Sequence, residues 1–187
     1  MIKTKDDLKL YLREDAKRNG MAEECLFKQF LRRVCGSEIA HINLWLRMFR
    51  KWEYHANNDH RLRAKYYEIR TKRIGFRLGI SGRINTVGYG LRIMHIGGGG
   101  GVRLGFKKAG NYCGFNAGVV IGTNGGEDLR PVLGNHVAFG PGAKAFGNLT
   151  IGNNVFIAPN AVVTKDCESD AIYGGIPAKL IKRKKND

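Results

Sequence analysis

The chain has 187 residues, of which 43% are hydrophobic and 26% are charged, a composition typical of a globular protein and not of a disordered one. Lys and Arg total 32 against 16 Asp and Glu, so the formal net charge is +16 at pH 7. Such a basic surface would suit an anionic partner or substrate. The sequence has no run of about 18 apolar residues, which excludes a membrane span. Its charged start lacks the apolar segment of a secretory signal, so a cytoplasmic location is predicted.

The four cysteines, at positions 25, 35, 113 and 167, form no pair with CxxC spacing. This spacing argues against a zinc site or a redox motif. In a reducing compartment we expect four free thiols that serve as small buried hydrophobic residues.

Glycine and proline divide the chain into two parts. Of 26 Gly, only Gly20 and Gly36 lie in residues 1–74, and all four Pro lie in residues 75–187. Because both residue types destabilise helix interiors, only the first part is free to be helical. We therefore predict a helical N-terminal domain over 1–74 and a second domain over 75–187 that ends in a basic tail.

The first part reads as four amphipathic helices. The first is expected to start at Thr4, where a hydroxyl is followed by acidic residues, and the others to span residues 25–34, 37–54 and 58–73. This part carries 18 of the 32 basic residues. A basic run on a helix is usually a solvated face, and an anionic partner or an oligomer contact is the alternative.

A six-residue repeat dominates the second part. Residues 133–168 divide into LGNHVA, FGPGAK, AFGNLT, IGNNVF, IAPNAV and VTKDCE, each with an apolar first residue. The same phase continues upstream at Phe115 and Ile121, and a shifted phase runs through Val87 and Ile93. A period of six predicts flat triangular coils in which each apolar residue stacks on the one 18 positions later. The fold class is therefore mainly β, a parallel β-helix.

The repeat resembles that of the left-handed parallel β-helix acyltransferases. GLRIMHIG (90–97), FGPGAKAFGNLTIGNN (139–154) and GGIPAKLI (174–181) resemble the serine acetyltransferase-like branch, over about residues 80–187. The resemblance implies a left-handed β-helix behind a short helical domain, with acetyl-CoA as co-substrate. It also implies a homotrimer, with trimers able to pair through the helical domain, which could otherwise cap the prism.

His95 is the residue on which the resemblance places the chemistry. It precedes the glycine run 97–101, where the regular coil breaks. A neutral imidazole can take the proton from a hydroxyl while that oxygen attacks a thioester. The resemblance therefore implies a general base at His95, and no metal is expected. The glycine run is read as a flexible rim beside the acceptor.

The chain departs from the family at three positions. Arg130 stands where the resemblance places a second His, and Met94 and Ile80 stand where it places Asp. These departures favour a sugar hydroxyl, in surface polysaccharide biosynthesis, as the acceptor, with L-serine as the second reading. The candidates for binding the acceptor or orienting His95 are Arg130, Asp128, Glu127 and Asn116. Arg130 suits a carboxylate or phosphate, and either acid could approach His95 from a neighbouring chain.

The resemblance also implies a groove between adjacent β-helices for acetyl-CoA. The candidate donor-binding residues are Gly122, Thr123, Gly140, Pro141, Ala143, Ala158, Lys165 and Lys179. Small residues allow the pantetheine arm to reach the backbone, and the lysines, with the basic residues 182–185, suit the phosphates.

Three other readings remain open. The net charge would suit a nucleic-acid binder, although no known binding motif is present, and no nucleic acid is predicted as a partner. A zinc enzyme of the carbonic anhydrase type needs three His, and the repeat offers only His95 and His136. A non-catalytic β-helix scaffold is the third.

Overall fold

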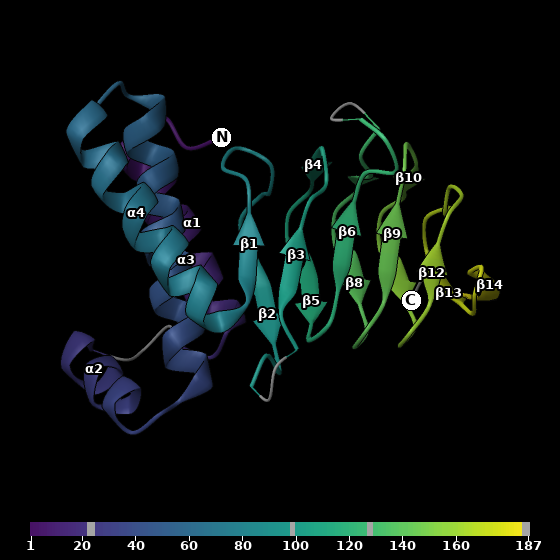
Figure 1. The fold of residues 1–187 in the computed structure, drawn as a ribbon, viewed down its shortest axis with the longest axis horizontal. Coiled ribbons are helices and arrows are strands. Elements are labelled where there is room, and N and C mark those ends of the chain that lie inside the picture. Colours follow the sequence, from purple (N-terminus) through teal and green to yellow (C-terminus); the bar gives the residue numbers. More distant parts are fainter. Residues whose placement is uncertain (22–24, 98–99, 127–128, 185–187) are drawn as a thin grey trace.

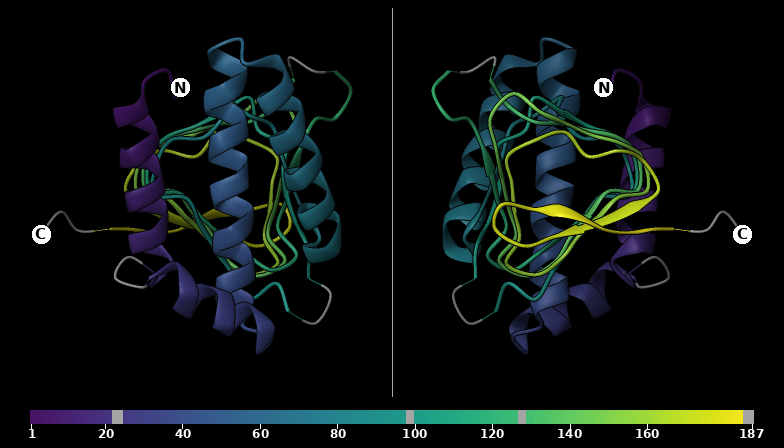
Figure 2. Two further views of the ribbon diagram at one scale, coloured as in Figure 1. Left: turned by 90° about the vertical axis from the view of Figure 1, so that its left-hand side faces the viewer. Right: turned by 90° about the vertical axis from the view of Figure 1, so that its right-hand side faces the viewer.

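The structure is a computed structural model that describes residues 1–21, 25–97, 100–126 and 129–184. A layer of helices covers one end of a β-prism, and the strands of the prism lie side by side, stacked one after another along its length (Figure 1). Viewed along its axis, the prism is triangular in section (Figure 2). The predicted class, a left-handed β-helix with an N-terminal helical part, is confirmed.

The helical part contains the four expected helices, with shifted ends. They are α1 (Lys5–Arg18), α2 (Leu26–Val34), α3 (Glu38–Asn57) and α4 (Arg61–Leu78). The start signal at Thr4 works as predicted, because the Thr4 hydroxyl accepts from the Asp7 amide and the Asp7 carboxylate accepts from the Thr4 amide. The last helix runs four residues past position 74, and β1 follows it directly.

The strands form the three faces of the prism. Face 1 holds β1 (Ile80–Gly82), β3 (Val102–Leu104), β6 (Val120–Gly122), β9 (Lys144–Phe146) and β12 (Val162–Val163). Face 2 holds β4 (Lys108–Ala109), β7 (Val132–Leu133) and β10 (Thr150–Ile151). Face 3 holds β2 (Arg92–Met94), β5 (Gly114–Asn116), β8 (Ala138–Phe139), β11 (Phe156–Ile157) and β13 (Ala171–Gly174), and the antiparallel strand β14 (Lys179–Arg183) ends it.

The repeat builds the core as predicted. The apolar first residue of every six-residue block is at most 3% exposed, namely Leu133, Phe139, Ala145, Ile151, Ile157 and Val163. Stacking 18 positions apart is visible in the register, where Ala138 pairs with Phe156. Inside the prism the Phe115 and Phe139 rings stack with centroids 5.7 Å apart. Burial of these side chains is the main driving force for the fold.

Two coils are longer than 18 residues, and the extra residues mark two loops. Strand β2 pairs with β5 at a spacing of 22, and β5 with β8 at a spacing of 24. The first insertion lies between β2 and β3, where a face-3 strand leads into face 1. The second lies between β6 and β7, where face 1 leads into face 2. We call these corners the His95 edge (residues 95–101 and the turns stacked on them) and the Thr123 edge (residues 123–131 and their stacked turns).

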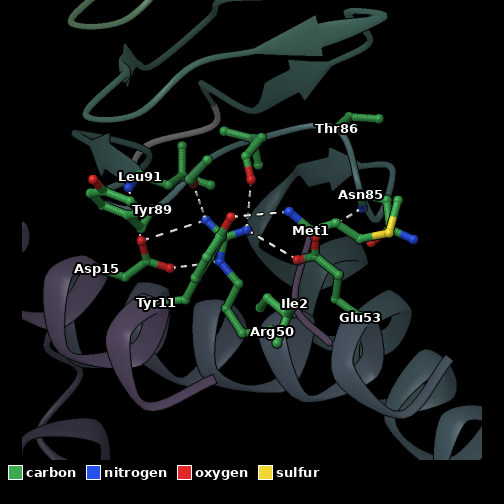
Figure 3. A network of polar contacts seen from close by, with 12 residues as sticks. Met1, Ile2, Tyr11, Asp15, Arg50, Glu53, Asn85, Thr86, Tyr89 and Leu91 are labelled. Atoms are coloured by element: carbon green, nitrogen blue, oxygen red, sulfur yellow. Dashed lines mark hydrogen bonds and ion pairs between the residues drawn. The ribbon is translucent and has the colours of Figure 1, made fainter. Parts of the chain in front are cut away.

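Buried polar side chains of the helices complete the first coil of the prism (Figure 3). Arg50 is fully buried and donates to the Val87 and Gly88 carbonyls at 3.0 and 2.6 Å. The Asp15 carboxylate accepts from the Leu91 amide at 2.9 Å, and the Glu53 carboxylate from the Asn85 amide at 3.0 Å. These backbone groups face away from the second coil, so the helices supply partners that a further coil would otherwise supply.

The three charges of this network also pair with each other. Arg50 contacts Asp15 at 2.8 Å and Glu53 at 3.1 Å, and each of the three side chains is at most 2% exposed. Burial alone would lower the pKa of Arg50, but the attraction of the two carboxylates outweighs it and raises that pKa. The guanidinium therefore stays charged and holds α1, α3 and the first coil together.

The cysteines divide into two classes. Cys113 and Cys167 are buried, as expected, while Cys25 and Cys35 are exposed, so the prediction of buried thiols is wrong for these two. The latter flank α2, whose apolar side chains Phe27 and Val34 are also exposed. No described helix combines the length and the apolar character needed to cross a membrane.

Arg50→Ala tests the network. The substitution leaves Asp15 and Glu53 as buried carboxylates without their cation, so we expect the free energy of unfolding to fall by about 3–5 kcal/mol. Urea unfolding followed by circular dichroism measures it. Lys65→Ala, which breaks an exposed pair with Glu68, is the control and should change little. A loss for Arg50→Ala no larger than that of the control would contradict the assignment.

Thiol labelling tests the two cysteine classes. Burial raises the pKa of Cys113 and of Cys167 to about 11, so at about pH 8 neither thiol supplies appreciable thiolate. We expect an aromatic disulfide reagent to label Cys25 and Cys35 rapidly in the folded protein and the other two only after unfolding. Rapid labelling of all four thiols without denaturant would show that the prism core is not closed.

Candidate active site

His95 directly follows β2, at the start of the first insertion. Strand β2 is fixed by pairing with β5, in which Met94 lies opposite Asn116. The next residue, Ile96, is buried in the core, so the imidazole stands between a strand and a buried anchor. His95 itself is exposed and has φ of +57°, a backbone conformation uncommon for residues other than Gly. The predicted position, where the regular coil breaks, is confirmed.

Several other candidates line up below His95 on the same edge. Asn116 ends β5 and donates its side-chain amide to the Phe139 carbonyl at 2.9 Å, which ties two coils together. Gly140 and Pro141 follow β8, and Ala158 follows β11, on successive turns of this corner. The His95 edge therefore carries the proposed base above the exposed Pro141, while Gly140 is buried against the next coil, where a Cβ would lie 2.7 Å from the Pro159 nitrogen.

A second group of candidates lies on the Thr123 edge. Gly122, Thr123 and Arg130 line one groove of about 330 Å³. The Thr123 hydroxyl accepts from the Gly126 amide at 2.9 Å, which folds the start of the second insertion. Arg83 and Arg103 line the same groove, so three arginine residues border one hollow, a composition suited to carboxylate or phosphate.

The remaining described candidates are two lysines and one alanine. Lys165 is exposed in the turn after β12, on the Thr123 edge, and Lys179 is exposed at the start of β14. Ala143 is fully buried in the prism core, and its amide and carbonyl pair with Gly140 and Val120, so this residue presents no free group to a ligand within this chain. Glu127, Asp128, Gly98 and Gly99 lie outside the described residues, as does the end of the basic tail from position 185.

The two groups of candidates lie at opposite ends of face 1. Its strands have two or three residues, and a three-residue strand spans about 10 Å. His95 and Arg130 of one chain therefore belong to different corners of the prism. The structure brings each group together but does not bring the two groups together within one chain.

The departures from the family are also visible in the structure. Ile80 is 4% exposed and packs in the core, so this position carries no polar group toward His95. His136 lies in a turn between faces 2 and 3, away from the His95 edge, and its ring stacks on Tyr112 at 5.1 Å. Among the described residues no three His, Cys, Asp or Glu side chains gather as a metal site would need.

Sequence reasoning missed three residues that the structure places beside these candidates. Arg103 points outward between the buried Val102 and Leu104, and this alternation was a signal available in the sequence. Arg83 lies in the turn after β1, where no alternation of apolar and polar residues pointed to it. Glu38, in the first turn of α3, accepts a hydrogen bond from the Ile96 amide at 2.8 Å, across 58 residues of sequence.

Known serine acetyltransferases are similar to this chain in sequence. No protein-family profile matches it. The serine acetyltransferase of Synechococcus elongatus is 40% identical over 100 residues, which cover 52% of this chain and 40% of that protein. Serine acetyltransferase 2 of Arabidopsis thaliana is 30% identical over 143 residues, 69% of this chain and 43% of that protein. The chain thus spans less than half the length of these curated relatives.

Solved structures show the same fold. The crystal structure of serine acetyltransferase from Brucella abortus strain S19 matches with a TM-score of 0.66 at 22% identity, over 96% of this chain and 70% of that one. A structure of the enzyme from that strain in complex with coenzyme A matches with a TM-score of 0.63 at 21% identity, over 97% and 69%.

The sequence matches and the shared fold agree with the resemblance carried by the repeat and by the segments around His95. The chain is thus similar in sequence to serine acetyltransferases, and it has the fold of their solved structures, a left-handed β-helix behind a helical part.

Proposed function

We propose that this chain is an acetyl-CoA-dependent O-acetyltransferase in which His95 is the general base. The observation that carries the proposal is the position of His95, exposed on the first insertion of the prism, within the part of the chain that resembles acetyltransferases. Similarity to serine acetyltransferases, one of them solved with coenzyme A, supports acetyl-CoA as the donor. A reaction that consumes acetyl-CoA also fits the cytoplasmic location predicted from the sequence.

The chemistry requires one group that takes and returns a proton. The His95 imidazole accepts the proton of the acceptor hydroxyl as its oxygen attacks the thioester carbonyl. The tetrahedral intermediate then collapses, the carbon–sulfur bond breaks, and the imidazolium returns the proton to the leaving thiolate. The products are the O-acetyl ester and coenzyme A, and His95 ends neutral. Placement of both substrates at one edge supplies much of the remaining rate enhancement.

The two edges lead us to place the complete site between chains. Within one chain the His95 edge and the Thr123 edge are separated by face 1, so His95 meets the arginine groove only when a second prism lies alongside. A closed ring of three prisms repeats this contact three times. The homotrimer implied by the resemblance is therefore part of the proposal. Exposed apolar side chains on α2 and α4, such as Phe30 and Phe76, offer a further surface for pairing trimers.

The relatives favour L-serine as the acceptor over a sugar, which reverses the order of the two sequence-based readings. In a composite site, the carboxylate of serine would meet Arg130 or its neighbours Arg83 and Arg103. A sugar hydroxyl is the second candidate, and it is favoured by Ile80 and Met94, which supply no carboxylate near the base.

For the donor, we propose that the pantetheine arm lies along the His95 edge, against Gly140, Pro141 and Ala158. Gly122 and Thr123, from the facing edge of the neighbouring chain, would complete that groove, while the buried Ala143 would support it from within the core. Lys165 and Lys179 are exposed cations that suit the nucleotide phosphates.

A turnover assay with His95→Ala tests the base. Thioester loss from acetyl-CoA is followed with L-serine, simple sugars and nucleotide sugars as acceptors. We expect the wild type to use L-serine and the variant to lose at least about 10²-fold in kcat with little change in KM for acetyl-CoA. His136→Ala, on another corner, is the control and should stay active. Turnover of a sugar and not of serine would establish the second candidate, and an active His95→Ala variant would refute the assigned base.

Subunit mixing tests the composite site. Arg130→Ala and His95→Ala are each expected to have little activity as pure proteins. When the two variants are co-expressed, about one quarter of the interfaces in randomly mixed trimers carry both intact residues, so about that fraction of activity should return. A mixture no more active than its parts would place both residues in one site within a single chain. Light scattering gives the oligomeric state of each sample.

A further inference from the structure

Glu38 touches the loop that carries His95. It lies in the first turn of α3, and its side chain crosses from the helical layer to the first coil. One carboxylate oxygen accepts from the Ile96 amide at 2.8 Å. The other lies so close to Gly97 that a Cβ there would be 3.0 Å from it. The carboxylate therefore lies against the backbone of both residues that follow His95.

The backbone at His95 needs such support. A non-Gly residue with a φ of +57° is held there by its surroundings and not by its own preference. On one side, the Ile93 amide donates to the Asn19 side chain at 3.3 Å. On the other side, the Ile96 amide donates to Glu38. His95 is thus fixed between two contacts, both made by side chains of the helical layer.

Glu38 is well placed for this task. A carboxylate is favoured in the first turn of a helix, and a hydrogen bond to a charged acceptor is stronger than one between neutral groups. The helix that carries it is anchored by the buried Arg50 network, so the contact has a rigid base. The side chain is only half-buried and lines a cavity of about 380 Å³ with His41 and Arg77. Because its hydrogen-bond partner is the neutral Ile96 amide, removal of the Glu38 side chain does not leave a buried charge at this contact.

We propose that Glu38 is a positioning residue for His95, acting through its hydrogen bond to the Ile96 amide. The inference rests on the proposed function, because it assigns Glu38 a role in the step that His95 performs. The helical layer then does more than close the prism. It sets the angle at which the imidazole meets the acceptor hydroxyl.

Two substitutions test the contact. Glu38→Ala removes the acceptor, and we expect kcat to fall about 10- to 100-fold while KM for acetyl-CoA stays within about twofold. Glu38→Gln keeps an oxygen at this position and should restore kcat to within about threefold of the wild type. Glu68→Ala, which removes a carboxylate from the exposed surface of α4, is the matched control and should leave kcat unchanged. All variants should melt within about 4 °C of the wild type.

Combining substitutions separates positioning from general stability. In a His95→Ala background, the further change Glu38→Ala should cost nothing more, because its effect passes through His95. The proposal is overturned if Glu38→Ala keeps wild-type kcat, if Glu38→Gln is as slow as Glu38→Ala, or if the two losses add.

Histidine NMR keeps the test independent of activity. The chain has five His, and the His95 ring signal is the one that disappears in His95→Ala. We expect Glu38→Ala to shift that signal and Glu38→Gln to leave it near its wild-type position. If the wild type turns over no acceptor, the proposed function fails while this readout still decides the contact. An unmoved signal in Glu38→Ala would overturn the inference.

Discussion

The open end of the β-helix is the constraint on which the rest of the structure depends. Every coil leaves backbone amides and carbonyls for the next coil to pair, and the first coil has no coil before it. Here α1 and α3 end the stack with buried side chains. Arg50 donates hydrogen bonds to two carbonyls of the first coil. The Asp15 and Glu53 carboxylates accept hydrogen bonds from the Leu91 and Asn85 amides. The carboxylates also neutralise the buried guanidinium, so the charges that pair with the coil satisfy each other. The stability of the first coil therefore depends on the helical layer, and that of the helical layer depends on the first coil.

The shape of the prism explains where the candidate site residues lie. The regular coils are packed too tightly for chemistry, since their apolar positions are fully buried and their turns are short. The two insertions provide the accessible candidate groups, the exposed His95 on one and the partly buried Arg130 on the other. A triangular prism places them on different corners, and two corners can meet only between neighbouring prisms. Under the proposed function, a symmetric assembly would therefore be needed to bring His95 and Arg130 into one site.

Much of the fold could be predicted because its signals are local. A six-residue period names the core positions one by one, and Thr4 marks the start of the first helix by its own capping contacts. The insertion at His95 could also be predicted, because the glycine run breaks the period. The cap could not be predicted. Arg50 donates a hydrogen bond to Asp15, 35 residues away, and Glu38 accepts one from the Ile96 amide, 58 residues away. No periodicity in the sequence links these residues. The relatives also favour the second of the two predicted acceptors, L-serine, over the first, because departures from a motif show what is missing and not what replaces it.

The most direct measurement is hydrogen exchange at the backbone amides of the first coil, read residue by residue by NMR. The Asn85, Leu91 and Ile96 amides have side chains of the helical layer as their acceptors, whereas Gly114 and Ala138 donate to neighbouring coils. If the helices complete the prism, the first group should be protected to a degree similar to the second. If the first group exchanges as fast as amides in open turns, the helices merely lie against the prism, and the account of how His95 is held is wrong.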